Sequence, residues 1–335
     1  MKQLREALWY DRAAGDRVSC RLCPHECLIP AGKVGLCAAR RNEAGRLISL
    51  NYGRCSSLAW DPVEKKPLYH FYPGRSLLSI GTVGCSFHCQ FCQNWEIARS
   101  QAETFAVTPE QILELLHARS PKNNIGVAYT YSEPLVWYEF VLETARAVKA
   151  AGYKNVLVTN GFIREGPLAD LLPYIDALNI DVKGFNREFY HRIVHGNYEP
   201  VLRTARMSHE AGCLVEVTTL LIPTLNDNPE EITELVSWVA GDLGPETPLH
   251  FSRYFPNYRL DLPPTPLETL RRTRDIAGQR LAHVYLGNVR DEDDDTYCPG
   301  CHARVIARRG YQVQILALDG NWCAACGREL NLVNE

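Results

Sequence analysis

The sequence predicts an α/β protein whose parallel strands form a full or partial β/α barrel, flanked by small N-terminal and C-terminal cysteine-rich metal modules. Two observations carry this prediction. Short apolar runs alternate with longer amphipathic stretches through the middle of the chain, as in strands joined by crossover helices. Cysteines cluster before, within and after that region. A doubly wound open sheet is the alternative, because periodicity alone does not show whether a parallel sheet closes.

The expected strands follow one another at intervals that leave room for helices. They lie at residues 77–83, 125–131, 155–159, 176–182, 214–221, 249–254 and 283–286. The clearest helix begins after Thr108, which can cap it, because Pro109 suits the first position and Ile112 and Leu116 follow at helical spacing. Polar or glycine residues follow several of the strands, and in barrel enzymes that edge holds the active site.

Three parts of the chain are expected from this pattern. They are a cysteine-rich extension over 1–70, a core barrel over 71–290 and a zinc-ribbon or rubredoxin-like module over 291–335. A chain of 335 residues is long enough for one large domain with such appendages. The acidic run 291–295 is interpreted as a solvated linker.

Composition narrows the class of protein and its surroundings. The net charge of -3 gives no support to a nucleic-acid partner, and the charged N-terminus has no apolar stretch typical of a signal peptide or membrane anchor. We therefore expect a cytoplasmic protein without a membrane partner. Its thirteen cysteines then favour metal binding over disulfides, because cytosolic thiols are kept reduced.

The loop GTVGCSFHCQFCQNW follows the first expected strand and spaces Cys85, Cys89 and Cys92 as C-x3-C-x2-C. A 4Fe-4S cluster ordinarily takes four cysteines, so three leave one iron open to another ligand. If that ligand is S-adenosylmethionine (SAM), the reduced cluster can cleave it to a 5'-deoxyadenosyl radical that abstracts hydrogen from a substrate. A zinc loop with a distant fourth ligand, such as His88, is the alternative.

The C-terminal cysteines form two C-x2-C pairs, Cys298/Cys301 and Cys323/Cys326. Four thiolates on two tight turns suit a closed tetrahedral site, for which zinc is the first choice and rubredoxin-like iron the alternative. Arg304, Arg308 and Arg309 make the same segment basic, and we interpret them as a solvated face.

The N-terminal cysteines are spaced as C-x2-C-x3-C-x9-C, which matches neither ferredoxin nor zinc-finger spacing closely. Zinc, an auxiliary iron-sulfur cluster and no metal all stay open, and His25 or Cys55 could replace one ligand. The four residues are Cys20, Cys23, Cys27 and Cys37.

Seven segments together resemble a known family. The three-cysteine loop, taken with YTYSEP, VTNGF, LNIDVKGF, LIPTLND, HFSRYFPNY and YLGNV, is similar to the radical SAM proteins of the AmmeMemoRadiSam system, relatives of the pyruvate formate-lyase activating enzymes. The resemblance implies a radical SAM enzyme with a 4Fe-4S cluster, SAM and a low-potential electron donor such as ferredoxin or flavodoxin. It implies a protein glycyl substrate or Ammecr/Memo-type partners as candidates, and a zinc-ribbon adaptor without catalysis is the competing class.

The resemblance also implies cofactor-binding roles. Ser132-Glu133 stands where activating enzymes have Gly-Gly-Glu, so Glu133 is expected to meet the ammonium of SAM, with a structural salt bridge as the alternative. Asp181 and Lys183 match an Asp-x-Lys that reaches the ribose and carboxylate, with a buried ion pair as the alternative. The remaining expected contacts are Thr159, Asn160, His250, Arg253 and Asn288.

Overall fold

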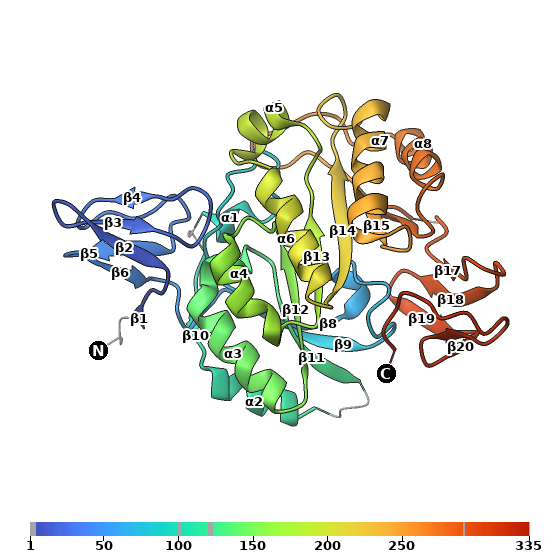
Figure 1. Cartoon of the computed structure of the whole chain (residues 1–335), viewed down its shortest axis with the longest axis horizontal. Coiled ribbons are helices and arrows are strands. Elements are labelled where there is room, and N and C mark those ends of the chain that lie inside the picture. The colour runs from blue at the N-terminus through green and yellow to red at the C-terminus, as the bar shows by residue number, and fades with distance from the viewer. Residues whose placement is uncertain (1–4, 100–101, 120–122, 291, 335) are drawn as a thin grey trace.

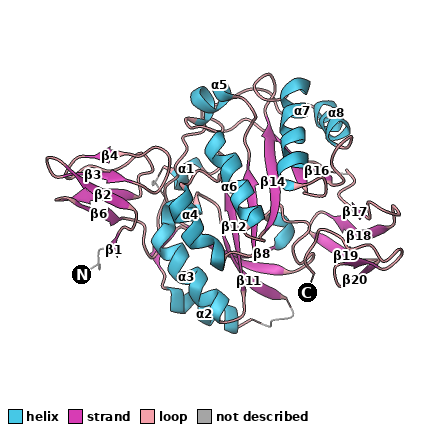
Figure 2. Ribbon diagram, in the orientation of Figure 1, coloured by secondary structure: helices cyan, strands magenta, loops and turns pink. Residues whose placement is uncertain are grey.

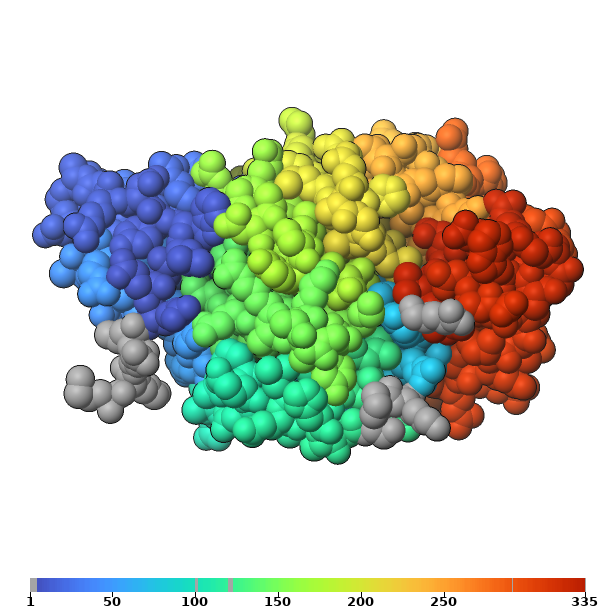
Figure 3. Space-filling model, turned by 60° about the horizontal axis from the view of Figure 1, so that its bottom comes forward, coloured from blue at the N-terminus to red at the C-terminus, as the bar shows by residue number. Residues whose placement is uncertain are grey.

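The computed structural model describes residues 5–99, 102–119, 123–290 and 292–334 (Figure 1). A central sheet with its helices occupies the middle, and two small β modules lie at opposite ends of the molecule (Figures 1 and 3). The N-terminal module is next to helix α4 (Glu165–Leu171), and the C-terminal module begins with β17 (Thr296–Tyr297) and β18 (Arg304–Arg309).

The central sheet has eight strands in the order β16-β15-β14-β13-β12-β11-β9-β8. All neighbouring pairs are parallel except β8 and β9. The seven strands expected from the sequence are confirmed, while β8 was not anticipated. The strands are β8 (Ser57–Pro62), β9 (Ser76–Gly81), β11 (Asn124–Tyr129), β12 (Lys154–Thr159), β13 (Ala177–Asp181), β14 (Leu214–Leu221), β15 (Leu249–Arg253) and β16 (Val284–Gly287).

The order of the strands decides between the expected architectures. From β9 to β16 each strand lies beside the next one in sequence, so the sheet does not reverse as a doubly wound sheet does. Its two edges, β8 and β16, do not pair with each other in the described part of the chain, so the partial β/α barrel is confirmed and the full barrel is not formed.

The helices cover one face of this sheet (Figure 2). They are α1 (Trp95–Ala98), α2 (Pro109–His117), α3 (Tyr138–Ala150), α4 (Glu165–Leu171), α5 (Arg187–Phe189), α6 (Glu199–Glu210), α7 (Pro229–Trp238) and α8 (Leu267–Ala277). The predicted start of α2 is confirmed: Thr108 and Gln111 form a capping box, and Pro109 occupies the first turn.

The other face of the sheet is closed at one end by residues 66–72, which we call the plug. Leu68 and Phe71 of the plug are buried with residues of that face. The amide of His70 donates to Glu216 Oε1 (2.7 Å), and the Pro67 carbonyl accepts from Asn179 Nδ2 (2.8 Å). The plug is therefore fixed by polar side chains of the central strands.

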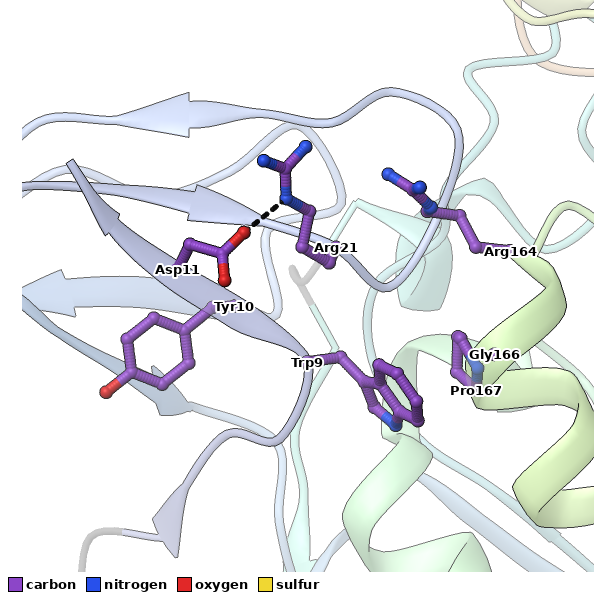
Figure 4. A pocket seen from close by; sticks show the side chains of 7 residues that line it. All are labelled: Trp9, Tyr10, Asp11, Arg21, Arg164, Gly166 and Pro167. Atoms are coloured by element: carbon purple, nitrogen blue, oxygen red, sulfur yellow. Dashed lines mark hydrogen bonds and ion pairs between the residues drawn. The ribbon is translucent and has the colours of Figure 1, made fainter.

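The N-terminal module consists of two three-stranded sheets, β1-β6-β5 and β2-β3-β4. Trp9 of this module packs against Gly166 at the start of α4, beside a surface pocket of about 410 Å³ (Figure 4). The strands are β1 (Arg5–Glu6), β2 (Tyr10–Ala13), β3 (Arg17–Cys20), β4 (Leu28–Ile29), β5 (Arg40–Glu43) and β6 (Arg46–Ser49), and β7 (Arg54–Cys55) pairs separately with β10 (Phe105–Ala106).

The C-terminal module packs on the plug. Arg308 donates to the Tyr69 carbonyl (2.7 Å), and the Val333 amide donates to the His70 carbonyl (2.8 Å). The strands of the module are β17 (Thr296–Tyr297), β18 (Arg304–Arg309), β19 (Gln312–Ile315), β20 (Leu318–Asp319) and β21 (Trp322–Cys323).

Two expectations about charged residues near this module are wrong. The run 291–295 is not a solvated linker: Glu292 pairs with Arg271 and Arg274, and burial raises the pKa of Asp294 to about 6. Asp291 lies outside the described residues. Arg308 does not belong to a solvated face, because it is buried where the module meets the plug.

Candidate active site

A cavity of about 470 Å³ opens at the end of the central sheet where the parallel strands terminate. Most of the site residues expected from the sequence line it: Cys85, Cys89, Cys92, Glu133, Thr159, Asn160, Asp181, Lys183 and Asn288. Since parallel strands bring their carboxyl ends to one edge, residues that are far apart in sequence meet there.

The three cysteines lie on the loop after β9, on the wall of the cavity. Asn160 Nδ2 lies 3.6 Å from Cys85 Sγ, and the Phe87 amide lies 3.4 Å from the same sulfur. Burial raises the pKa of all three thiols, that of Cys89 to about 12. A metal that binds here must displace these protons, so binding is stronger at higher pH.

The donor set suits an iron-sulfur cluster. Three soft sulfur ligands converge on one cavity, within electrostatic reach of one another, and the cavity leaves space beside them. The alternative fourth ligand His88 does not line the cavity, because its Nε2 lies 3.0 Å from the Leu36 carbonyl on the other side of the loop. The structure therefore does not bring His88 together with the three thiols in the cavity.

Glu133 is buried and ties the end of β11 to the end of β12. Its Oε1 accepts from the Thr159 hydroxyl (2.6 Å) and the Leu135 amide (2.9 Å), and its Oε2 accepts from the Asn160 amide (2.8 Å). Burial raises the pKa of the carboxyl to about 7, although these hydrogen bonds oppose the shift. The described partners of the carboxylate are a hydroxyl and two backbone amides, and no described cation forms the salt bridge considered as an alternative.

Asp181 and Lys183 flank the end of β13 and both line the cavity. Their charged groups are 3.1 Å apart. Burial acts to lower the pKa of Lys183, but the carboxylate of Asp181 outweighs it and holds the pKa above its usual range. The two residues thus form the ion pair and still offer a carboxylate and an ammonium to a ligand.

His250 and Arg253 do not reach the cavity, contrary to expectation. His250 Nε2 lies 2.6 Å from Glu216 Oε2, and the ring packs on Tyr69 of the plug and on Tyr285. His250 is the second residue of β15, and its side chain is directed to Glu216 and the plug, not into the cavity. The Arg253 side chain turns away to the Thr265 carbonyl (2.8 Å).

A buried charged group at the deep end of the cavity was missed. Lys66 Nζ donates to Asp61 Oδ2 (2.8 Å), Tyr131 donates to the same oxygen (2.6 Å), and Lys65 bonds the other oxygen (2.7 Å). Burial alone would raise the pKa of Asp61, but these hydrogen bonds hold it well below its usual range. Lys65, Lys66 and Tyr131 all line the cavity.

The C-terminal cysteines form a second, compact site. Their four sulfurs lie within 4.8 Å of one another, with 3.7 Å between Cys298 and Cys326 and 3.7 Å between Cys301 and Cys323. Sulfurs about 2.3 Å from one tetrahedral ion would be ~3.8 Å apart, so the expected four-thiolate metal site is confirmed in its geometry.

Comparisons with known proteins agree with this architecture. The model of the radical SAM superfamily matches residues 79–239. The uncharacterised protein MJ0808 of Methanocaldococcus jannaschii is 42% identical over 98% of this chain and 100% of its own. Pyruvate formate-lyase 1-activating enzyme of Escherichia coli is 24% identical over 58% of this chain and 86% of its own.

Solved structures share the fold. SuiB of Streptococcus suis bound to its precursor peptide SuiA has a TM-score of 0.52 at 15% identity, over 68% of this chain and 52% of that chain. A radical SAM methyltransferase from Sphaerobacter thermophilus has a TM-score of 0.50 at 18% identity, over 64% of this chain and 67% of that chain.

The chain belongs to the radical SAM superfamily and, within it, to the same family as the M. jannaschii protein. It is therefore an enzyme of the class that uses SAM and a 4Fe–4S cluster. None of the described helices has the length and apolar character needed to cross a bilayer.

Proposed function

We propose that this enzyme holds its cluster on Cys85, Cys89 and Cys92 and binds SAM in the adjoining cavity. When bound, the cluster and SAM supply a 5'-deoxyadenosyl radical that abstracts hydrogen from the substrate. One observation carries the proposal: a single cavity unites the three thiols with the Asp181–Lys183 pair.

The residues around the thiols suit the polar groups of SAM. Asp181 can accept from the ribose hydroxyls, and the ammonium of Lys183 can pair with the carboxylate. Glu133 has remaining acceptor capacity on Oε2, which accepts only one described hydrogen bond, and this can serve the ammonium of SAM. Asn288 has φ of 58° and bonds the Arg253 carbonyl, so its backbone can approach the adenine.

The deep end of the cavity is proposed as the substrate end. It is lined by Lys66, which is buried, and by Thr218, whose hydroxyl is buried without a hydrogen-bond partner among the described residues. The aromatic rings of Phe87 and Phe91 also line the cavity and are buried, so they exclude water from the reacting atoms. These groups would position a polar substrate below the thiols.

The test is anaerobic reconstitution with iron and sulfide, reduction, and measurement of 5'-deoxyadenosine released from SAM. We expect Cys92→Ala to abolish release and to lower the iron content, while the zinc or iron at the C-terminal site stays bound. Cys213→Ala is the matched control, because Cys213 is also buried but packs in the apolar core, with its thiol at the Ile175 carbonyl, and is not among the residues that line the cavity. Absence of 5'-deoxyadenosine from a protein whose cluster is present and reduced would contradict the proposal.

A protein substrate is the second candidate. It is supported by the similarity to pyruvate formate-lyase activating enzymes. In that case a substrate protein labelled with deuterium at glycine Cα should transfer deuterium into 5'-deoxyadenosine. Transfer from a small molecule alone would instead exclude the activating role.

The partners follow from the same chemistry. We propose a low-potential donor such as ferredoxin or flavodoxin as the source of the electron, and Ammecr/Memo-type proteins as candidate partners. Thirteen free cysteines and an oxygen-sensitive cluster suit a reducing compartment, so we place the enzyme in the cytoplasm.

A further inference from the structure

The four N-terminal cysteines gather in space although they span two loops of the module. Cys20 ends β3, Cys23 and Cys27 lie in the next loop, and the Cys20 amide donates to the Cys27 carbonyl (3.0 Å). Cys37 is brought in from the turn before β5. A Cβ on Gly35, two residues before Cys37, would lie 3.8 Å from Cys27 Sγ, and the thiols of Cys20, Cys27 and Cys37 all act electrostatically on Cys23, so the four sulfurs lie near one another.

The N-terminal cysteine set is wider than the C-terminal metal site. Among all described residues, only the C-terminal cysteines place three or more potential ligand atoms within 4.8 Å of one another. A single zinc ion requires such close sulfurs, whereas each sulfur of a 4Fe–4S cluster binds its own iron at a separate corner and lies farther from the others. The three-cysteine loop shows the same wider spacing.

A buried positive charge lies beside the N-terminal cysteines. Arg40 is 1% exposed and acts electrostatically on both Cys20 and Cys37. Its Nη2 pairs with Glu139 (2.7 Å), but its Nε has no partner among the described residues. A buried guanidinium in this position would offset the negative charge of an anionic centre held by the cysteines.

The same module contacts the three-cysteine loop through its own cysteine loops. His25, between Cys23 and Cys27, has Nε2 2.8 Å from the Ser86 carbonyl, and His88 has Nε2 3.0 Å from the Leu36 carbonyl. Gly84 is so close to the Cys37 carbonyl that a Cβ on it would lie 2.6 Å from that oxygen. Residues adjacent to Cys85 therefore touch residues adjacent to Cys27 and Cys37.

The outer side of the module presents apolar side chains next to the cysteines. Leu28 is 50% exposed and follows Cys27, and Leu36 is 55% exposed and precedes Cys37. Exposed apolar groups at this density beside a redox-type cysteine set suit transient docking of a one-electron carrier protein.

We propose that Cys20, Cys23, Cys27 and Cys37 bind a second 4Fe–4S cluster, which accepts one electron from a protein donor and passes one electron to the cluster on the three-cysteine loop. All four irons are capped by protein thiolates, so this cluster cannot chelate SAM. The relay role rests on the proposed function, whereas the presence of the cluster does not.

The first test counts iron in full-length proteins after anaerobic reconstitution. The unaltered chain should bind about eight irons and eight sulfides, and the Cys85→Ala/Cys89→Ala/Cys92→Ala variant about four of each. The cluster that remains in this variant should give a reduced electron paramagnetic resonance signal that SAM does not change. Cys23→Ser should lose the second cluster and keep the SAM-sensitive one, while Cys213→Ala should keep both.

Two results would overturn the second cluster: a triple variant that binds zinc in place of iron, or an unaltered chain with only about four cluster irons by Mössbauer spectroscopy. The latter measurement does not depend on any variant folding. Failure of the unaltered chain to cleave SAM with both clusters reduced would refute the proposed function and leave the second site standing.

The second test measures how fast the SAM-binding cluster is reduced by an external electron donor. With reduced flavodoxin as donor, Leu28→Asp/Leu36→Asp should slow reduction of the SAM-binding cluster at least tenfold without changing the iron content. With dithionite, which needs no docking surface, the same variant should be reduced at the parent rate. Leu267→Asp, an exposed leucine on α8, is the control. Equal flavodoxin rates in parent and variant would refute the relay.

Discussion

The two outer modules each carry four cysteines, but they use them in different surroundings. The C-terminal four have sulfurs 3.7 Å apart and lie in a module that packs on the plug, away from the cavity mouth. The N-terminal four are more widely spaced and lie against the loop of Cys85. The two modules have the same number of cysteines. At the C-terminal end these form a compact site suited to a single ion, whereas at the N-terminal end they lie next to the three-cysteine loop of the cavity.

The largest expected effect is on the C-terminal module. Its apolar core is small, and buried Cys298 and Cys323 belong to that core, so the metal must supply most of its stability. Cys323→Ser should therefore remove the ion and unfold the module, because structural zinc contributes on the order of 10 kcal/mol. Hydrogen exchange should show lost protection over 296–334.

The same variant checks that the two modules are independent. Iron in the N-terminal module and on the three-cysteine loop should be retained in Cys323→Ser when measured per folded molecule. If Cys323→Ser lost iron and zinc together, the two modules would be coupled. That result would contradict the view that they bind their metals independently.

The next largest effect is on stability, at the ion pair that attaches the N-terminal module to helix α3. Arg40 and Glu139 are both 1% exposed in their side chains, and Glu139 Oε1 also accepts from the Leu8 amide. Arg40→Met should cost about 3–5 kcal/mol in urea unfolding, since it leaves a buried carboxylate unpaired. Arg40→Met/Glu139→Leu should recover most of this loss, and a double variant as unstable as the single one would argue against the ion pair.

A pH effect is expected where the C-terminal module meets the sheet. Burial lowers the pKa of His283 to about 4, and its ring packs on His70, 4.4 Å between centroids. The unfolded chain takes up a proton near pH 6.5 but the folded chain does not until about pH 4, so stability falls by up to about 3 kcal/mol as the pH drops through this window. Glu246 and Arg308 also act on His283, in opposite directions.

The measurement is the difference between parent and His283→Phe in unfolding free energy from pH 7 to pH 4. This difference removes the contribution of Asp294, whose raised pKa acts in the opposite sense between about pH 6 and pH 4. His209→Phe, an exposed position on α6, should keep the parent slope. An unchanged slope in His283→Phe would refute the prediction.

The smallest predicted effect is a difference in stability between two glycine substitutions. It distinguishes the cost of a close contact between modules from the cost of backbone strain alone. Gly84 (φ +99°) and Gly152 (φ +82°) both adopt conformations that favour glycine, but a Cβ meets the Cys37 carbonyl only at Gly84. Gly152→Ala should cost about 1 kcal/mol, and Gly84→Ala about 1–3 kcal/mol more, because the N-terminal module must shift from the loop. Equal costs in thermal unfolding would mean that this contact is unimportant.

The parts of the fold that the sequence could predict are those with strong local patterns. All seven parallel strands have apolar runs of strand length, and α2 has its cap and first-turn proline in sequence order. The three-cysteine loop and the two C-x2-C pairs are short-range motifs, and the structure places each as expected. No local sequence pattern indicates whether the two edge strands pair with each other. The sequence therefore left open whether the sheet closes into a full barrel.

The rest depends on contacts between distant segments. Lys66 reaches the cavity only because the plug enters the sheet beside Asn179, more than a hundred residues later, and nothing near Lys66 in sequence indicates this. His250 was expected at the cavity from the family resemblance, but it lies near the start of β15 and its ring is paired with Glu216. The domain limits 1–70, 71–290 and 291–335 stay predictions, although β8 joins the central sheet.

The plug also affects the order in which ligands can bind in the cavity. Leu68 and Phe71 are buried against residues near the amino ends of the strands, so the plug fills that end of the sheet, while Lys66 of the same segment lines the cavity. If SAM binds beside Cys85, Cys89 and Cys92 as proposed, a substrate that contacts Lys66 is expected to bind first and SAM second. An ordered kinetic mechanism would then be a consequence of this short buried segment.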